Sequence, residues 1–218
     1  MRNLIFCCLL LTLAAGEVHC QSEESQAAIP RMSSSEGIQK RWNEFGIWGA
    51  ISFNSPWQFG SRNNARFGDL GLRYGRVLAA SRSVAFEWTI DAVPLAILSN
   101  DRSTPVPTGT GVQNTRKSVY GAGLSPIGLK FNFSRQHRVQ PFAGGSGGFV
   151  YFREDVPIPN ALRFKFTFDV SGGIQIINLS RRSFLIGYRY KHLSNGGRSP
   201  INPGVDVQMV FAGFSVFK

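Results

Sequence analysis

Residues 161–178 read ALRFKFTFDVSGGIQIIN, and apolar side chains recur in them at every second position. Successive side chains of a β-strand point to opposite faces of the sheet, so this segment has one apolar face and one polar face. The apolar face holds Phe164, Phe166, Phe168, Val170, Ile174 and Ile176, and the other face holds Arg163, Lys165, Thr167, Asp169, Ser171 and Gln175. The alternation predicts a β-strand that is apolar on one side only.

Seven further segments alternate in the same way between turn residues, at 45–53, 69–75, 83–92, 127–133, 138–152, 182–193 and 205–217. Their connections are short near 80–82, 134–137 and 178–182. They are long and rich in Pro, Gly, Ser and Asn near 54–66, 99–117, 153–160 and 194–204. Short turns on one side and long loops on the other are typical of membrane barrels. We therefore predict an all-β fold, an eight-stranded antiparallel transmembrane up-and-down β-barrel, over residues 41–218.

The two faces of such strands meet different surroundings. In a membrane barrel the apolar face meets lipid and the polar face fills the lumen, whereas a soluble ligand-binding barrel reverses this arrangement. An eight-stranded barrel is just wide enough to be filled by its side chains, so a lumen with charges of both signs can pair them. The charged residues expected inside are Glu87, Asp91, Lys130, Arg163, Lys165, Asp169, Arg189 and Lys191.

Residues 1–20 have the pattern of a secretory signal peptide. Arg2 precedes an apolar run from Leu4 to Ala15 that is too short to span a bilayer comfortably, and cleavage after Gly16 or Cys20 fits. A buried core helix and a lipoprotein anchored through Cys20 are the less favoured alternatives. Residues 21–40 are polar and low in aromatic side chains, which predicts a flexible N-terminal segment.

The cysteine positions and the net charge restrict the kinds of cross-link and partner that the protein can have. All three cysteines (Cys7, Cys8 and Cys20) lie in the predicted signal peptide, so no internal disulfide is expected in the mature chain. The net charge of +11 favours anionic partners, and secretion argues for lipopolysaccharide and outer-membrane lipids over nucleic acid. We expect no cofactor, and no Cys or His spacing indicates a metal. The sequence does not decide between a monomer and a homodimer.

One candidate motif, Gly-x-Ser-x-Gly at 144–148, does not carry chemistry in this context. That motif needs a turn from a strand into a helix, and the following residues, Phe149 to Phe152, continue a strand. We expect its glycines to thin the strand.

A stronger constellation lies between the last two predicted strands, at residues 188–206. His192 and Ser194 share a strand face with Tyr188 and Tyr190, so both are expected on the lipid-facing side of the wall. A serine hydroxyl becomes nucleophilic when an imidazole takes its proton, and a carboxylate orients the imidazole. Asp206 begins the next strand and is the candidate carboxylate.

Two alternatives remain at this constellation. His192 and Ser194 could merely end a strand, with Asn195 beginning the turn. Asp206 shares its face with Gln208, Val210, Ala212, Phe214 and Val216, while Val207, Met209, Phe211 and Phe217 read as the better lipid face. On that assignment a bulge or the loop is needed to turn Asp206 outward.

The segment His192-Leu193-Ser194-Asn195, followed by Asn202-Pro203-Gly204-Val205-Asp206, resembles the motif of the PagL family of outer-membrane lipid A 3-O-deacylases. The resemblance implies an eight-stranded barrel and a serine esterase that removes the 3-O-linked acyl chain from lipid A. It assigns Ser194 as nucleophile, His192 as base and Asp206 as orienting acid. Asn202, Asn195 and Gly204 would stabilise the oxyanion or position the substrate.

The sequence departs from the family motif at one position, and a second interpretation of the protein's function competes with the resemblance. The family acid is usually Glu, and Asp206 is shorter by one methylene, so its reach to His192 depends on the backbone. The rival is a non-catalytic structural or adhesive eight-stranded outer-membrane barrel. Near the site, Arg198 could hold lipid A phosphates or be a solvated loop charge.

Overall fold

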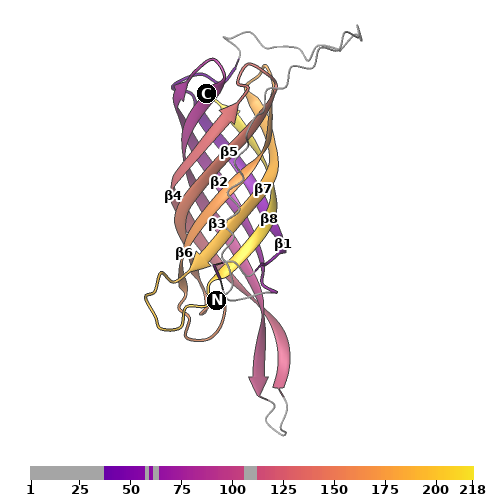
Figure 1. Ribbon diagram of the computed structural model, residues 1–218, viewed down its shortest axis with the longest axis vertical. Coiled ribbons are helices and arrows are strands. Elements are labelled where there is room, and N and C mark those ends of the chain that lie inside the picture. The colour runs from indigo at the N-terminus through magenta and orange to yellow at the C-terminus, as the bar shows by residue number, and fades with distance from the viewer. Residues whose placement is uncertain (1–36, 57–58, 61–63, 106–111) are drawn as a thin grey trace, which may run out of the picture.

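The computed structural model describes residues 37–56, 59–60, 64–105 and 112–218. Its strands are β1 (Asn43–Asn54), β2 (Arg66–Ala80), β3 (Val84–Pro105), β4 (Val112–Phe133), β5 (Val139–Phe152), β6 (Phe164–Ile177), β7 (Arg182–Ser194) and β8 (Val205–Phe217). Each strand pairs with its neighbours in the chain, and β1 pairs with β8, so the sheet closes into a barrel (Figure 1). The predicted fold class, strand number and strand order are confirmed.

The predicted signal peptide and residues 21–36 of the predicted flexible segment lie outside the described residues. Residues 37–40 are described, and Ile38 is buried against Val77, Ile177 and Phe217. Its carbonyl oxygen accepts a hydrogen bond from Arg135 at 2.8 Å. The end of this segment therefore packs on the barrel. Within the part of the chain that the structure describes, no helix has the length and apolar character to cross a membrane.

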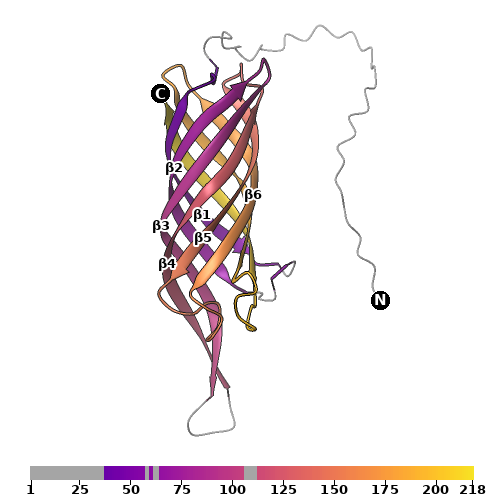
Figure 2. The same cartoon turned by 90° about the vertical axis from the view of Figure 1, so that its left-hand side faces the viewer.

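The barrel has a turn end and a loop end (Figures 1 and 2). Short connections at 81–83, 134–138 and 178–181 lie at the turn end with the C-terminus, and the longer ones lie at the loop end. The long loop predicted over 99–117 is wrong for most of its length, because β3 and β4 stay paired as far as Pro105 and Val112. This hairpin extends beyond the wall, where the sequence is polar and shows no apolar alternation although the backbone ladder continues.

The outer wall is apolar and the lumen is charged. Large apolar side chains are exposed on the wall, among them Phe45, Ile47, Ile51, Leu72, Phe166, Phe168, Val170, Ile174, Phe184, Ile186, Val210 and Phe214. The lumen buries Glu44, Glu87, Asp91, Lys130, Lys165, Asp169, Arg189 and Lys191. The alternative of a soluble barrel with an apolar cavity is therefore wrong. The prediction also fails for Arg163, which precedes β6 and is exposed.

Ion pairs join the charged side chains of the lumen. Lys130 Nζ lies 2.7 Å from Glu44 Oε2 and 3.0 Å from Glu87 Oε2. Arg73 and Asp91 form a two-pronged pair at 2.7 and 2.8 Å. Buried charges are costly without such partners. The barrel is therefore stable only if the charged side chains in its narrow lumen are paired, as the sequence predicts.

A glycine makes room for the largest side chain of the lumen. A Cβ on Gly71 would lie 2.2 Å from the ring of Trp48, so no other residue fits at that position without displacing the ring. The Trp48 ring in turn packs 4.1 Å from the guanidinium carbon of Arg189. The barrel is packed across its width at this level.

Replacing Lys130 with Met should lower the free energy of unfolding by about 3–5 kcal/mol, because two buried carboxylates lose their cation. Lys117→Met is the matched control: Lys117 is exposed at the loop end, beside Glu154, and its loss should cost at most about 1 kcal/mol. Urea unfolding of vesicle-inserted protein, followed by tryptophan fluorescence, measures both. Equal effects would show that the lumen pair contributes no more than a surface pair.

Candidate functional site: a His–Asp pair on the outer wall

The register of β7 and β8 places His192 directly opposite Asp206 at the loop end. Cross-strand neighbours have Cβ atoms about 4.5–5.5 Å apart, which is within reach of an imidazole and a carboxylate. His192 Nδ1 lies 2.6 Å from Asp206 Oδ1. Because Nδ1 is held by the carboxylate, the other ring nitrogen, Nε2, is the one left to accept a proton.

The prediction for the faces of β8 is wrong, and the error concerns Asp206. Val207, Met209, Phe211 and Phe217 are buried in the lumen, whereas Val210 and Phe214 are exposed on the wall. Asp206 has the parity of the outward set, so it faces His192 without a bulge. β8 is apolar on both faces because its inward aromatics pack on lumen cations: the Phe211 ring lies 4.6 Å from the guanidinium of Arg189.

Asp206 is nevertheless 0 % exposed, because residues of the β1–β2 connection cover it. Its Oδ2 accepts hydrogen bonds from the backbone amides of Phe59 at 2.6 Å and Gly60 at 2.7 Å. The Ser55 hydroxyl donates to the Asp206 backbone oxygen at 2.7 Å. Sequence reasoning missed these three residues. Gly60 stands 146 positions from Asp206, and no local pattern signals such a contact.

Ser194 lies on the same outward face of β7 as His192, two residues closer to the loop, and is partly exposed. Its cross-strand partner on β6 is Phe166. Among the described residues its hydroxyl makes no hydrogen bond to His192. Catalytic hydrogen bonds are often long before substrate binds, so the shared face is the relevant observation here. The structure thus joins His192 to Asp206 and places Ser194 beside them.

The two asparagines of the motif have different roles in the structure. Asn195 is buried, and its side chain donates to the Ile201 carbonyl and accepts from the Gly197 amide, both at 2.9 Å. Its backbone amide donates to Asn202 Oδ1 at 2.9 Å. Asn195 therefore organises the β7–β8 loop, while the side chain of Asn202 is held next to the Ser194–Asn195 peptide.

Gly204 allows a close approach of two parts of the site. A Cβ at this position would lie 3.0 Å from His192 Cε1 and 3.2 Å from the Cα of Gly60. The missing side chain allows the imidazole and the β1–β2 connection to meet over the start of β8.

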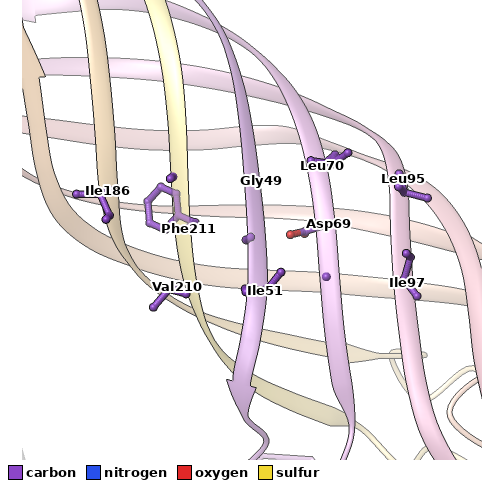
Figure 3. Close-up of a pocket in the computed structure, with 12 residues that line it drawn as sticks. Gly49, Ile51, Asp69, Leu70, Leu95, Ile97, Ile186, Val210 and Phe211 are labelled. Atoms are coloured by element: carbon purple, nitrogen blue, oxygen red, sulfur yellow. The ribbon is translucent and has the colours of Figure 1, made fainter. Parts of the chain in front are cut away.

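An apolar groove of about 460 Å³ lies on the outer wall and extends across β7, β8, β1, β2 and β3 (Figure 3). Small residues, including Gly49, Gly68 and Ala212, lie between larger side chains, which include Ile51, Leu70, Ile97, Ile186 and Val210. Val210 follows Asp206 by four residues on β8, and strands rise about 3.3 Å per residue. The groove therefore begins about 13 Å from the His–Asp pair.

Other candidate features do not add to this site. Ser146 of the Gly-x-Ser-x-Gly stretch lies within β5, as expected, and its hydroxyl donates to Asp169 Oδ2 at 2.8 Å in the lumen. Arg198 is exposed on the β7–β8 loop, 5.4 Å from the Phe164 ring. Within the described ranges, no group of three or more His, Cys, Asp and Glu side chains is arranged to bind a metal ion.

A family model described as lipid A 3-O-deacylase (PagL) matches residues 71–215, a range that includes His192, Ser194 and Asp206. The chain belongs to the PagL family. It is accordingly a bacterial outer-membrane barrel of a family of lipid A deacylases, whose substrate is a lipid. A comparison with curated proteins gave no match.

Three solved structures are similar to this chain at low sequence identity, and the first of them, with a TM-score above 0.5, shows the same fold. The crystal structure of the outer membrane enzyme PagL matches with a TM-score of 0.55 and 14 % identity, over 77 % of this chain and 97 % of that one. The outer membrane protein OprG from Pseudomonas aeruginosa matches with a TM-score of 0.49 and 10 % identity, over 84 % and 98 % of the two chains. Neisserial surface protein A matches with a TM-score of 0.46 and 15 % identity, over 80 % and 96 %.

Asn195→Ala should loosen the β7–β8 loop, because it removes both side-chain hydrogen bonds of a buried amide, at a cost of about 1–3 kcal/mol. Hydrogen exchange of the Gly197 amide should accelerate by about tenfold or more, since each 1.4 kcal/mol is a factor of ten. Asn178→Ala is the matched control, because Asn178 makes the same kind of bond, to the Arg182 amide, at the turn end. Unchanged exchange at Gly197 would contradict the role given to Asn195.

Proposed function

We propose that this PagL-family protein hydrolyses the 3-O-linked acyl ester of lipid A, with Ser194 as nucleophile, His192 as base and Asp206 as the acid that orients the base. The observation that carries the proposal is the 2.6 Å hydrogen bond between His192 and Asp206 on the outer wall, with Ser194 on the same face of β7. This arrangement also supports Asp in place of the family's usual Glu, because the strand register brings the shorter side chain within reach.

In the first half of the reaction, Ser194 Oγ attacks the carbonyl carbon of the ester while His192 Nε2 takes the hydroxyl proton. Asp206 stabilises the imidazolium that forms. The tetrahedral intermediate then collapses. Its bond to the sugar oxygen breaks, that oxygen takes the proton from His192, and the acyl group stays on Ser194.

In the second half, His192 removes a proton from a water molecule that attacks the acyl-enzyme. The ester bond to Ser194 breaks, Oγ regains the proton, and the fatty acid leaves. The water comes from the aqueous side of the loop end, because His192 and Ser194 are both partly exposed there.

The oxyanion of each intermediate needs a donor close to Ser194. Asn202 is the best candidate, since its Oδ1 accepts from the amide of Asn195, the next residue after Ser194. The Nδ2 of the same amide group is thereby held near the reacting serine. The side-chain donor of Asn195 is already used on Ile201, which argues against a second oxyanion role there.

The position of the site suits an amphipathic substrate. Lipid A that diffuses in the outer leaflet meets the wall from the side, and the apolar groove lies below the site where acyl chains would run. Arg198, exposed on the adjacent loop, is available for a charge-assisted bond to a phosphate.

Ser194→Ala should abolish deacylation, because it removes the nucleophile. Mass spectrometry of lipid A from cells that express wild type or variant should show loss of one 3-O-acyl chain with wild type only. Ser180→Ala, the same change at an exposed position of the turn end, should leave the activity intact. Equal acylation with and without Ser194 would favour the non-catalytic barrel.

Asp206→Asn should reduce kcat by roughly 10³–10⁴-fold, because the neutral amide does not stabilise the imidazolium and favours the wrong imidazole tautomer. KM should change little, since Asp206 is buried behind His192 and does not face the substrate. Turnover of a lipid A substrate in mixed micelles measures both constants. A variant as active as wild type would remove Asp206 from the mechanism.

A further inference from the structure

We infer that the β1–β2 connection is part of the catalytic apparatus, in which the backbone amides of Phe59 and Gly60 position the carboxylate of Asp206. Ser55, Phe59 and Gly60 are named here the Asp206 clamp. The inference rests on the proposed function, because a positioned acid matters only if His192 acts as the base.

The clamp binds the two oxygen atoms of Asp206 that His192 does not bind. Oδ1 is bound to the imidazole, Oδ2 accepts the amides of Phe59 and Gly60, and the backbone oxygen accepts the Ser55 hydroxyl. Hydrogen bonds from backbone amides to a carboxylate are short and strong, and these measure 2.6 and 2.7 Å. The plane of the carboxylate is therefore set from both of its oxygens.

A clamp is needed because of the direction in which Asp206 points. Outward side chains of this wall otherwise meet lipid, where an ionised carboxylate without donors is very costly. The lumen cations that pair the other buried carboxylates lie on the opposite side of the sheet. The β1–β2 connection supplies two amide donors from outside, and Asp206 is 0 % exposed.

The clamp depends on Gly60. A Cβ on this residue would lie 2.4 Å from the carbonyl oxygen of Gly204 and 2.9 Å from the amide nitrogen of Val205. These are backbone atoms of the start of β8, so they do not yield as a flexible side chain would. A larger residue at position 60 must lift the connection away from Asp206.

The Phe59 side chain has no part in holding the acid. Its ring is 79 % exposed and lies edge-on to the His192 ring, with 6.1 Å between centroids. Only its backbone amide reaches Asp206.

The test is a double-mutant cycle between Gly60→Ala and Asp206→Ala, with kcat and KM measured on lipid A in micelles. Gly60→Ala alone should lower kcat by about 10- to 100-fold with little change in KM, as expected when a catalytic group is misplaced by about 1 Å. In the Asp206→Ala background the same change should alter kcat by no more than about twofold, because the group it positions is gone.

The control is Gly147→Ala. It should keep kcat within about threefold of wild type, because the Cβ that it adds meets nothing within 4 Å. Equal losses from Gly60→Ala in both backgrounds would show a merely structural effect and overturn the inference. Unchanged kcat in Gly60→Ala would overturn it as well.

A measurement without turnover separates this inference from the proposed function. In protein labelled with ¹⁵N-glycine, the Gly60 amide proton should move upfield in Asp206→Ala, while the Gly147 signal stays. If Ser194→Ala leaves lipid A processing unchanged but Gly60 responds, the contact stands and the esterase proposal falls. If processing needs Ser194 but Gly60 does not respond, the clamp falls alone.

Discussion

The pairing of β1 with β8 closes a ring of backbone hydrogen bonds, and the other features of the molecule depend on it. Inside a bilayer each backbone N–H and C=O needs a partner within the protein, which an open sheet edge cannot provide. Closure at eight strands makes the lumen narrow, so charged side chains that point inward must pair with one another. Closure also brings the first connection of the chain beside the last strand, and for that reason Gly60 can reach Asp206 across 146 positions.

Most of the fold could be predicted because the two faces of its strands differ strongly in polarity. β6 is the clearest case, where Phe166 and Phe168 face outward while Lys165 and Asp169 lie in the lumen. The prediction failed where that contrast is absent. β8 is apolar on both faces, since Met209 and Phe211 fill the lumen, and hydrophobicity alone chose the wrong side. The far part of the β3–β4 hairpin has a polar sequence without alternation, which is typical of a loop.

The candidate site, like the fold, could be predicted only in part from the sequence. Local sequence placed Asp206 at the start of the strand next to His192 but left open which face it occupies. The register of β7 and β8 brings the two residues directly opposite each other. The motif offered both asparagines for the oxyanion or for substrate positioning, because both are equally polar. Their burial differs, since Asn195 is buried within the loop and Asn202 is exposed. The Asp206 clamp could not be predicted from the sequence. Backbone amides carry no residue-specific signal, and the contact joins residues that are 146 positions apart in the chain.

The location of the candidate site at the loop end suits the proposed ester hydrolysis on a lipid. In the proposed reaction the acyl chain stays in hydrocarbon while the second half consumes water, so the proposed nucleophile should stand where the two phases meet. A site deeper in the wall would lack water, and its carboxylate would face lipid without donors. At the rim, a connection from the aqueous side can fold over the acid, as Phe59 and Gly60 do, while His192 and Ser194 stay open to the leaflet. The charges of the lumen pair with one another, so the proposed chemistry needs only residues of the outer wall and of the loop end.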